Sequence, residues 1–313
     1  MKTQFDIERP ELKRQIKLYC CLLMRKKIHL VTSVFVLAYL VLVTVTNARA
    51  SGIPFAIIEP GEYTLPTNYE SFNVFAQYGF YQNDSRMFDG NGHNIKGSGT
   101  DTLVGLSKYA HFFTIKSIPD VGFAMLAMIP EVSVSGPGVS VSGFADPMIG
   151  PAIWIKPSKS STLGIQSYLQ IPVGNQEVSD RTWATNTSLF GDIRFGDLNI
   201  EGDVGFIIKS TRHTTGANDI DPGSAFHVNM LTSYSLNKSL EPLVSLDYQN
   251  TDASKDKVTG LTTAPTSNEL AVGAGMMFHL TDSISLATRY VYGVDGKNTP
   301  VTNALYFKFT SVW

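Results

Sequence analysis

The sequence predicts an all-β protein, a transmembrane antiparallel up-and-down β-barrel of about 12 strands. Three observations predict this class. After residue 50, apolar and polar residues alternate with period two in segments of about 10–14 residues. Long and short connections between these segments also alternate, and the chain ends on an apolar strand. No segment after residue 50 has the sustained apolar spacing of an amphipathic helix.

The composition excludes several other classes. Only 17% of the 313 residues are charged, whereas soluble domains average about 25%. The net charge of -2 offers no basic excess to neutralise phosphates, so no nucleic-acid partner is expected. The two cysteines, Cys20 and Cys21, are adjacent, which excludes a disulfide-stapled fold and a multi-cysteine zinc site.

Residues 1–50 have the three parts of a secretory signal peptide. A basic cluster at Met24–Lys27 is followed by an apolar run at Ile28–Thr46, and Asn47–Ala50 supplies the small residues of a cleavage site. We therefore expect cleavage after Ala50, which removes both cysteines and suits an exported protein.

Two alternatives at this end stay open. The apolar run is about 19 residues long, which exceeds the usual ~7–15 of a signal peptide and approaches the ~20 of a membrane helix. An uncleaved anchor is therefore the alternative to a cleaved signal. Residues 1–23 form an unusual polar extension, and translation that starts at Met24 would leave them outside the protein.

After the signal we expect two regions. Residues 51–68, which include Pro54, Pro60 and Pro66, form a periplasmic lead-in that could dip into the barrel lumen. Residues 69–313 form the outer-membrane β-barrel. Its strands are predicted at 69–81, 102–114, 121–134, 146–156, 162–173, 183–195, 198–210, 224–236, 240–251, 267–280, 283–293 and 303–313.

The alternation assigns a lipid face and a lumen face to each strand. It is clearest in 198–210, where Val204, Phe206 and Ile208 oppose Glu201 and Asp203. The apolar set is expected to face lipid and the polar set to face the lumen. The second, third and fourth segments alternate poorly: they contain Pro130, Pro147 and Pro151, and residues 125–130 are apolar on both faces, so the count could change by two.

The connections set the orientation. The long ones are 82–101, 135–145, 174–182, 211–223, 252–266 and 294–302, and the short ones are 115–120, 157–161, 196–197, 237–239 and 281–282. Outer-membrane barrels have short periplasmic turns and long external loops, so both ends of the barrel sequence are expected on the periplasmic side. A closed barrel also leaves no unpaired backbone edge in lipid.

Aromatic residues near the strand ends predict two interfacial girdles. One predicted ring contains Tyr78, Phe80, Tyr81, Trp183, Tyr248, Tyr290 and Tyr292. The other contains Phe195, Tyr234, Phe278 and Trp313. Aromatic side chains of this kind mark the two membrane–water interfaces of a barrel.

Polar residues on the predicted inward faces are the candidate lumen-lining residues. They are Asp192, Arg194, Glu201, Asp203, Lys209, His227, Glu241, Asp247, Glu269, Arg289 and Lys308. One interpretation is a set of interior ion pairs that rigidify a narrow barrel, because a buried charge must be paired or hydrated. The other is a polar pore wall whose charges bias selectivity. The sequence does not separate the two.

No catalytic, cofactor-binding or metal-binding residues are predicted. The chain after residue 50 has no G-x-x-x-x-G-K-[ST], H-E-x-x-H or C-x-x-C pattern. His227 and Asn229 share an inward face, and outer-membrane phospholipases use His, Ser and Asn. In those enzymes the His and Ser lie two apart on a strand, whereas here Asn229 takes that place. His227 is therefore interpreted as a polar lumen residue.

The last strand resembles the C-terminal signature of outer-membrane proteins. Leu305, Phe307 and Phe309 alternate before a terminal aromatic residue, Trp313. The resemblance implies that the barrel-assembly machinery recognises this strand. Ser311, and Trp in place of the usual terminal Phe, depart from the signature.

From about residue 72 to 313 the chain also resembles the bacterial family named for the meta-pathway of phenol degradation, a set of outer-membrane proteins. The resemblance is carried by Asn73–Phe75, Gly143–Pro147, Gly164–Gly174 and Trp183–Asn186. It implies a location in the cell outer membrane and uptake of hydrophobic or aromatic compounds. It supplies no catalytic residues.

The predicted function is passage or uptake of small molecules through an outer-membrane barrel that is not an enzyme. The expected partners are outer-membrane lipid, the barrel-assembly machinery and a small-molecule solute. One alternative is a structural or adhesive barrel with a closed lumen. A second alternative is a lipid-modifying barrel enzyme.

Overall fold

The computed structural model describes residues 59–213 and 216–313. The predicted signal peptide, its cleavage site and residues 51–58 of the lead-in lie outside the described residues. In the described part of the chain, no helix is long and apolar enough to cross a membrane.

Twelve long antiparallel strands make up the barrel in the described residues. They are β1 (Phe72–Asn83), β4 (Asp101–Ile115), β5 (Ile118–Gly136), β7 (Met148–Ser158), β8 (Ser161–Gln170), β9 (Ala184–Phe195), β10 (Leu198–Lys209), β12 (Ala225–Tyr234), β13 (Leu240–Thr251), β16 (Ser267–His279), β17 (Ile284–Lys297) and β19 (Asn303–Val312). Each predicted segment overlaps one of these strands.

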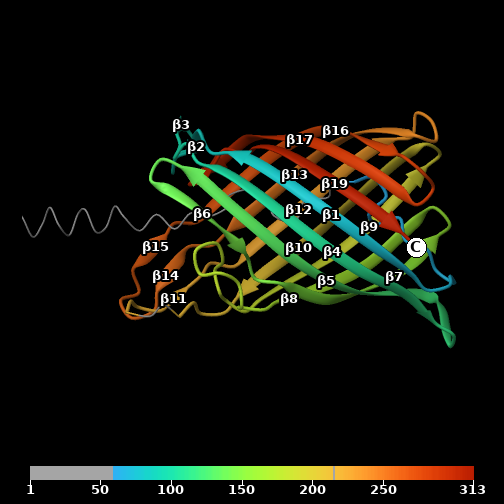
Figure 1. Cartoon of the computed structure of the whole chain (residues 1–313), viewed down its shortest axis with the longest axis horizontal. Coiled ribbons are helices and arrows are strands. Elements are labelled where there is room, and N and C mark those ends of the chain that lie inside the picture. The colour runs from blue at the N-terminus through green and yellow to red at the C-terminus, as the bar shows by residue number, and fades with distance from the viewer. Residues whose placement is uncertain (1–58, 214–215) are drawn as a thin grey trace, which may run out of the picture. The chain divides into compact units, whose positions relative to one another are not determined.

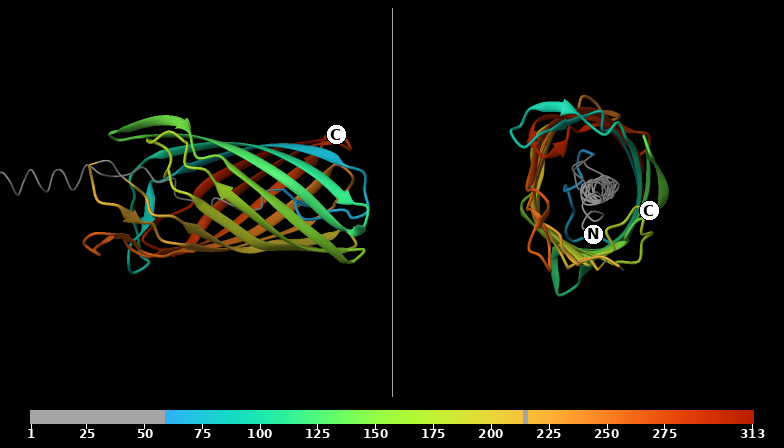
Figure 2. Two further views of the ribbon diagram at one scale, coloured as in Figure 1. Left: turned by 90° about the horizontal axis from the view of Figure 1, so that it is seen from below. Right: turned by 90° about the vertical axis from the view of Figure 1, so that its left-hand side faces the viewer.

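The sheet closes on itself. Each barrel strand pairs with the next one along the chain, and β1 pairs with both β4 and β19. The first and last strands therefore meet, and the tilted strands enclose an interior, as Figure 1 and the end view in Figure 2 show. This confirms the predicted fold, a transmembrane antiparallel up-and-down β-barrel.

The connections alternate as the sequence predicts. Short turns lie at the end of the barrel where the chain terminates, and long loops lie at the opposite end (Figure 1). The long loops carry two small sheets. One consists of β2 (Arg86–Phe88), β3 (Asn94–Lys96) and β18 (Thr299–Pro300), and the other of β11 (Ile220–Asp221), β14 (Ser254–Asp256) and β15 (Thr262–Ala264).

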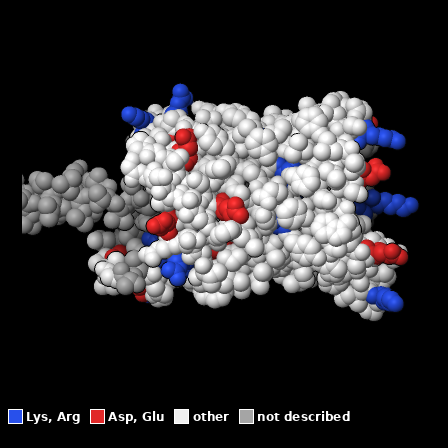
Figure 3. Space-filling view, in the orientation of Figure 1, with Lys and Arg blue, Asp and Glu red and all other residues white. Residues whose placement is uncertain are grey.

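The two faces of the strands differ as expected. In β10, Phe206 and Ile208 are about 60% exposed on the outside, whereas Glu201 and Asp203 are buried inside. On the surface shown in Figure 3, most charged side chains lie towards the two ends of the barrel, and the band between them is largely uncharged. A band of this kind is the surface that a bilayer requires.

Strand β5 changes its pairing partner along its length, which explains why its segment contains a proline. It pairs with β7 from Val121 to Met128, and from Glu131 it pairs instead with β6 (Val139–Phe144). Pro130 lies between these two stretches, and its carbonyl accepts a hydrogen bond from the Ala145 amide. A residue without an N–H is tolerated at the point where the strand changes partner. Of the other two prolines, Pro147 precedes β7 and Pro151 lies within it.

The orientation of the barrel can be tested on cells. A tag inserted after Val258, in the long connection between β13 and β16, is expected to be labelled on intact cells, because long loops face outwards. A tag after Lys238, in the short turn between β12 and β13, should be labelled only after the outer membrane is opened. Labelling of the Lys238 tag alone would mean that the orientation is inverted.

Candidate functional site

The barrel interior has two unlike walls. Strands β4, β5, β7, β8 and β9 supply an apolar wall, formed by the buried side chains Ala110, Ala124, Leu126, Met128, Met148, Ala152, Trp154, Tyr168 and Phe190. Strands β5 and β7 alternate poorly in sequence because they are apolar towards both lipid and the interior, whereas β8 and β9 also bury the polar side chains of Thr162, Asn186 and Ser188. The expectation that every strand turns a polar face inwards is wrong for β5 and β7.

Two glycines let aromatic rings lie flat on this wall. A Cβ at Gly122 would come within 2.2 Å of the Trp154 ring, and one at Gly164 would come within 2.3 Å of the Phe190 ring. Each ring therefore lies across a neighbouring strand at a position where only glycine leaves room. The two rings are held in place by the backbone beneath them.

The opposite wall is polar, and its charges are paired. Asp203 of β10 accepts a hydrogen bond from Asn229 and lies 3.0 Å from His227 Nε2. In the next pair, Arg289 Nη1 lies 3.1 Å from Asp247 Oδ2. The guanidinium of Arg289 also lies over the Tyr306 ring, 5.0 Å from its centroid.

Two further carboxylates on this wall are bound by other segments of the chain. Glu269 accepts hydrogen bonds from the backbone N–H of Thr302 at 2.6 Å and from its hydroxyl at 2.8 Å. Glu241 accepts one from Ser233 at 2.7 Å and lies 3.4 Å from His279 Nε2. The inward acids are therefore held in specific pairs.

Two of the predicted lumen residues lie at the ends of the barrel. Lys209 is the last residue of β10 and forms a 2.6 Å ion pair with Asp180 of a long loop. Arg194 is exposed next to the short turn after β9, so it does not line the interior. At the end of a strand, a side chain that alternation assigns to the lumen can therefore lie outside it.

A segment before the first strand enters the interior. Residues Glu59–Pro66, the plug, lie inside the barrel wall, where Figure 2 shows them in blue in the end view. Glu201 accepts hydrogen bonds from the backbone N–H groups of Gly61 at 2.7 Å and Tyr63 at 3.0 Å. On the apolar wall, Trp154 Nε1 donates a 2.7 Å bond to the Pro66 carbonyl. Both walls therefore hold the backbone of the plug.

The acids of the plug pair with lysines of the wall. Glu59 and Glu62 lie 3.1 and 3.2 Å from Lys308 Nζ, and Glu62 lies 3.7 Å from Lys108 Nζ. The Tyr78 hydroxyl donates a 3.0 Å hydrogen bond to Glu62. Burial alone would raise the pKa of Glu62, but the two lysines and the hydrogen bonds lower it to about 2. Glu62, which lies outside the membrane-spanning strands, is therefore ionised at neutral pH.

The aromatic residues of the plug and wall stack. Tyr63 lies on Phe190 with ring centroids 4.6 Å apart, and its hydroxyl accepts a hydrogen bond from Gln166. The predicted girdle is wrong for Tyr78 and Phe80, which point into the barrel: Tyr78 binds Glu62, and Phe80 packs on Tyr306. Both stand on the inward face of β1.

Several residues of this site carry no clear signal in the sequence. Lys108 and Trp154 stand in segments with poor alternation, and Glu59 and Glu62 stand in a segment without any period. A lone lysine between apolar residues of a predicted strand is the one hint that the sequence offers. The plug contacts themselves join residues far apart in the chain.

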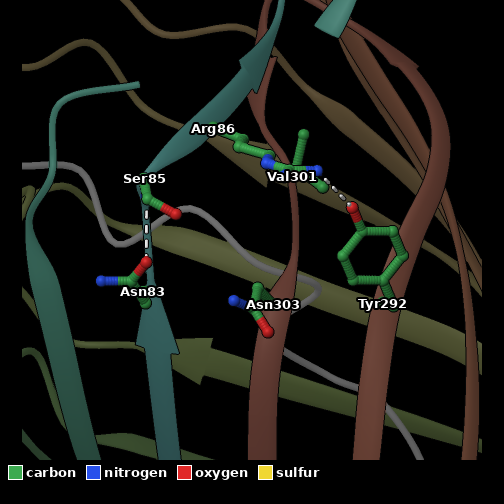
Figure 4. A pocket seen from close by; sticks show the side chains of 6 residues that line it. All are labelled: Asn83, Ser85, Arg86, Tyr292, Val301 and Asn303. Atoms are coloured by element: carbon green, nitrogen blue, oxygen red, sulfur yellow. Dashed lines mark hydrogen bonds between the residues drawn. The ribbon is translucent and has the colours of Figure 1, made fainter. Parts of the chain in front are cut away.

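A separate small pocket lies at the long-loop end. It has a volume of about 250 Å³ and is lined by Asn83, Ser85, Arg86, Tyr292, Val301 and Asn303 (Figure 4). The Arg86 guanidinium donates a 3.4 Å hydrogen bond to the Tyr292 hydroxyl. The pocket shares no residue with the plug or with the two interior walls.

Comparisons with known proteins agree with this fold. Residues 84–309 match the family described as "Putative MetA-pathway of phenol degradation". No curated protein matches the sequence. Among solved structures, the chain is similar to an outer membrane channel from Pseudomonas putida F1, with a TM-score of 0.70 and 14% identity over 82% of this chain and 100% of that one.

A second solved structure has a lower similarity. The beta domain of the Bordetella autotransporter Brka gives a TM-score of 0.50 with 10% identity, over 78% of this chain and 100% of that one. At these identities the likenesses show the fold alone. That fold is the outer-membrane β-barrel.

Proposed function

This chain belongs to the phenol-degradation MetA-pathway family, and we propose that it is an outer-membrane channel for small, partly apolar organic molecules, closed by its own plug. The observation that carries the proposal is the interior with two walls. An apolar wall would be of little use to a pore for hydrated ions alone. Facing a charged wall, it suits solutes that have both an apolar body and a polar group.

The solved structure with the TM-score of 0.70 is itself a channel, which supports the same reading. In the open state the candidate lumen residues of the charged wall, such as Glu201, Asp203 and Asp247, would line the path of the solute. Their charges would then act on a passing ion at short range and set the ion preference of the channel.

Insertion by the barrel-assembly machinery is part of the proposal. Leu305, Phe307 and Phe309 lie on the outer face of β19, and Trp313 is exposed at its end. They are therefore accessible to a factor that reads the last strand. The outward apolar residues of all the strands would then contact outer-membrane lipid.

One alternative has an observation in its favour. The plug is bound inside the barrel and interior charges are paired, as they would be in a closed structural or adhesive barrel. The lipid-modifying enzyme finds less support, because His227 faces the interior, bound to Asp203, whereas a lipid substrate would lie outside the wall.

Release of the plug tests the proposal. The double variant Glu59→Gln/Glu62→Gln removes the ion pairs with Lys308 and Lys108. Each lost charged contact is worth about 1.5–3 kcal/mol, so the open fraction should rise at least about tenfold. Planar-bilayer recording of the full chain would show this as more frequent or longer conducting events.

The matched control is Glu70→Gln, which neutralises an exposed acid just after the plug. It should leave the recordings of the parent protein unchanged. If the double variant and a chain lacking residues 59–66 both fail to conduct, the channel is refuted and the closed structural barrel takes its place.

A further inference from the structure

We propose that Lys308, Lys108 and Tyr78 form a binding site for the carboxylate of an aromatic acid, and that Glu62 of the plug occupies this site in the closed barrel. The proposal rests on the proposed function and names the class of solute that the channel would bind.

The anion half of the site is built from three adjacent strands. Lys308 of β19 pairs in register with Tyr78 of β1, and Lys108 stands on β4, the next strand. Their side chains converge on the two oxygens of one carboxylate: Tyr78 Oη and Lys108 Nζ lie 3.0 and 3.7 Å from Glu62 Oε1, and Lys308 Nζ lies 3.2 Å from Oε2. Two ammonium groups and a hydroxyl are the donors that a carboxylate requires.

These lysines need an anion. In the described part of the chain, every carboxylate that forms an ion pair with Lys108 or Lys308 belongs to the plug. When the plug leaves, two neighbouring ammonium groups remain in a narrow interior without a counter-charge. Unpaired charges in such surroundings are costly, so another anion should take the place of Glu62.

The apolar wall begins directly beside this site. Met128 of β5 is the cross-strand partner of Lys108, and Leu126 is the partner of Ala110, which lies on the same face of β4. Cross-strand partners have Cβ atoms about 5 Å apart. A ring attached to a carboxylate held by Lys108 would therefore lie against Met128 and Leu126, where it is removed from water.

The plug itself has the two chemical parts of such a solute. Glu62 supplies a carboxylate to the lysines, and the next residue, Tyr63, supplies an aromatic ring to Phe190 on the apolar wall. The plug would therefore act as an internal competitor, and a solute with the same two parts would displace it.

Benzoate is the probe for this site, with acetate as the anion without a ring and benzyl alcohol as the ring without a charge. In the Glu59→Gln/Glu62→Gln variant, benzoate should reduce the ion current at a concentration at least about tenfold below that of either comparison compound. In the parent protein it should bind more weakly, because Glu62 competes.

Two substitutions added to this variant separate the halves of the site. Lys108→Met should lower the affinity for benzoate about tenfold. Met128→Gln should lower the affinity for benzoate until it is close to that for acetate, and it should leave the affinity for acetate unchanged. The matched control is Lys116→Met, which removes an exposed lysine from the turn after β4 and should change nothing.

Calorimetric titration of the same proteins in detergent measures binding without any current. Equal affinities for benzoate and acetate, or no effect of Lys108→Met and Met128→Gln, would overturn the site even in a barrel that conducts. A barrel that binds benzoate as described but does not conduct would refute the channel and keep the site.

Discussion

Leu189→Arg is expected to lower the stability of the barrel in a bilayer by about 2–4 kcal/mol, the cost of an arginine on the lipid face near the membrane centre. Leu189 lies in the middle of β9 and is 55% exposed on the outer surface. Its partners in register, Val204 and Ile165, are also apolar and exposed. Denaturant unfolding in phospholipid vesicles would measure the loss.

Phe195→Arg is the matched control for this change. Phe195 stands on the same face of the same strand, but at its end beside a short turn. There an arginine reaches the interface, and the cost should fall to about 0–1 kcal/mol. Equal losses at the two positions would mean that the membrane does not surround the barrel where the apolar band places it.

The strands could be predicted because two local signals agree in each of them. In β10, alternation gives the face and the Gly196-Asp197 turn gives the start, so the predicted 198–210 is observed as Leu198–Lys209. Strand β17 is less exact: predicted to end at residue 293, it continues to Lys297. Its last residues pair with β16 through a bulge, which period-two counting does not detect.

The interior could be predicted only in part. The rule of apolar outside and polar inside holds for β10 and β12, where Asp203 and His227 meet. It fails for β5, where Leu126 and Met128 are buried inside. An apolar residue facing inwards and one facing lipid look alike in the sequence, so a wall apolar on both sides appears as lost periodicity.

The pairing of charges could not be predicted. Alternation places Asp247 and Arg289 inside, but only the strand register brings them together across β13, β16 and β17. The contacts of the plug are harder still to predict, because the Gly61 amide binds Glu201, a residue 140 positions further along the chain. Contacts between residues so far apart in the chain leave no local pattern, which is why the sequence does not predict the partners of the plug.

Arg289→Met is the second change with a large expected effect. Arg289 is fully buried and pairs with Asp247, which is also buried. Removal of the arginine leaves Asp247 in the interior without its counter-charge, at a cost of about 3–5 kcal/mol in unfolding free energy. The double variant Arg289→Met/Asp247→Leu should recover most of this loss, and the mutant cycle measures the coupling.

Lys209→Met provides the comparison, because the Lys209–Asp180 ion pair is partly exposed at the long-loop end. Loss of a hydrated pair should cost about 0–1 kcal/mol. A large loss of unfolding free energy for Arg289→Met, together with a small loss for Lys209→Met, would mean that water does not screen the charged wall while the plug is in place. Equal small losses would mean that water reaches Asp247 in the resting barrel. In that case the paired charges already line a hydrated pore, and the plug does not close it.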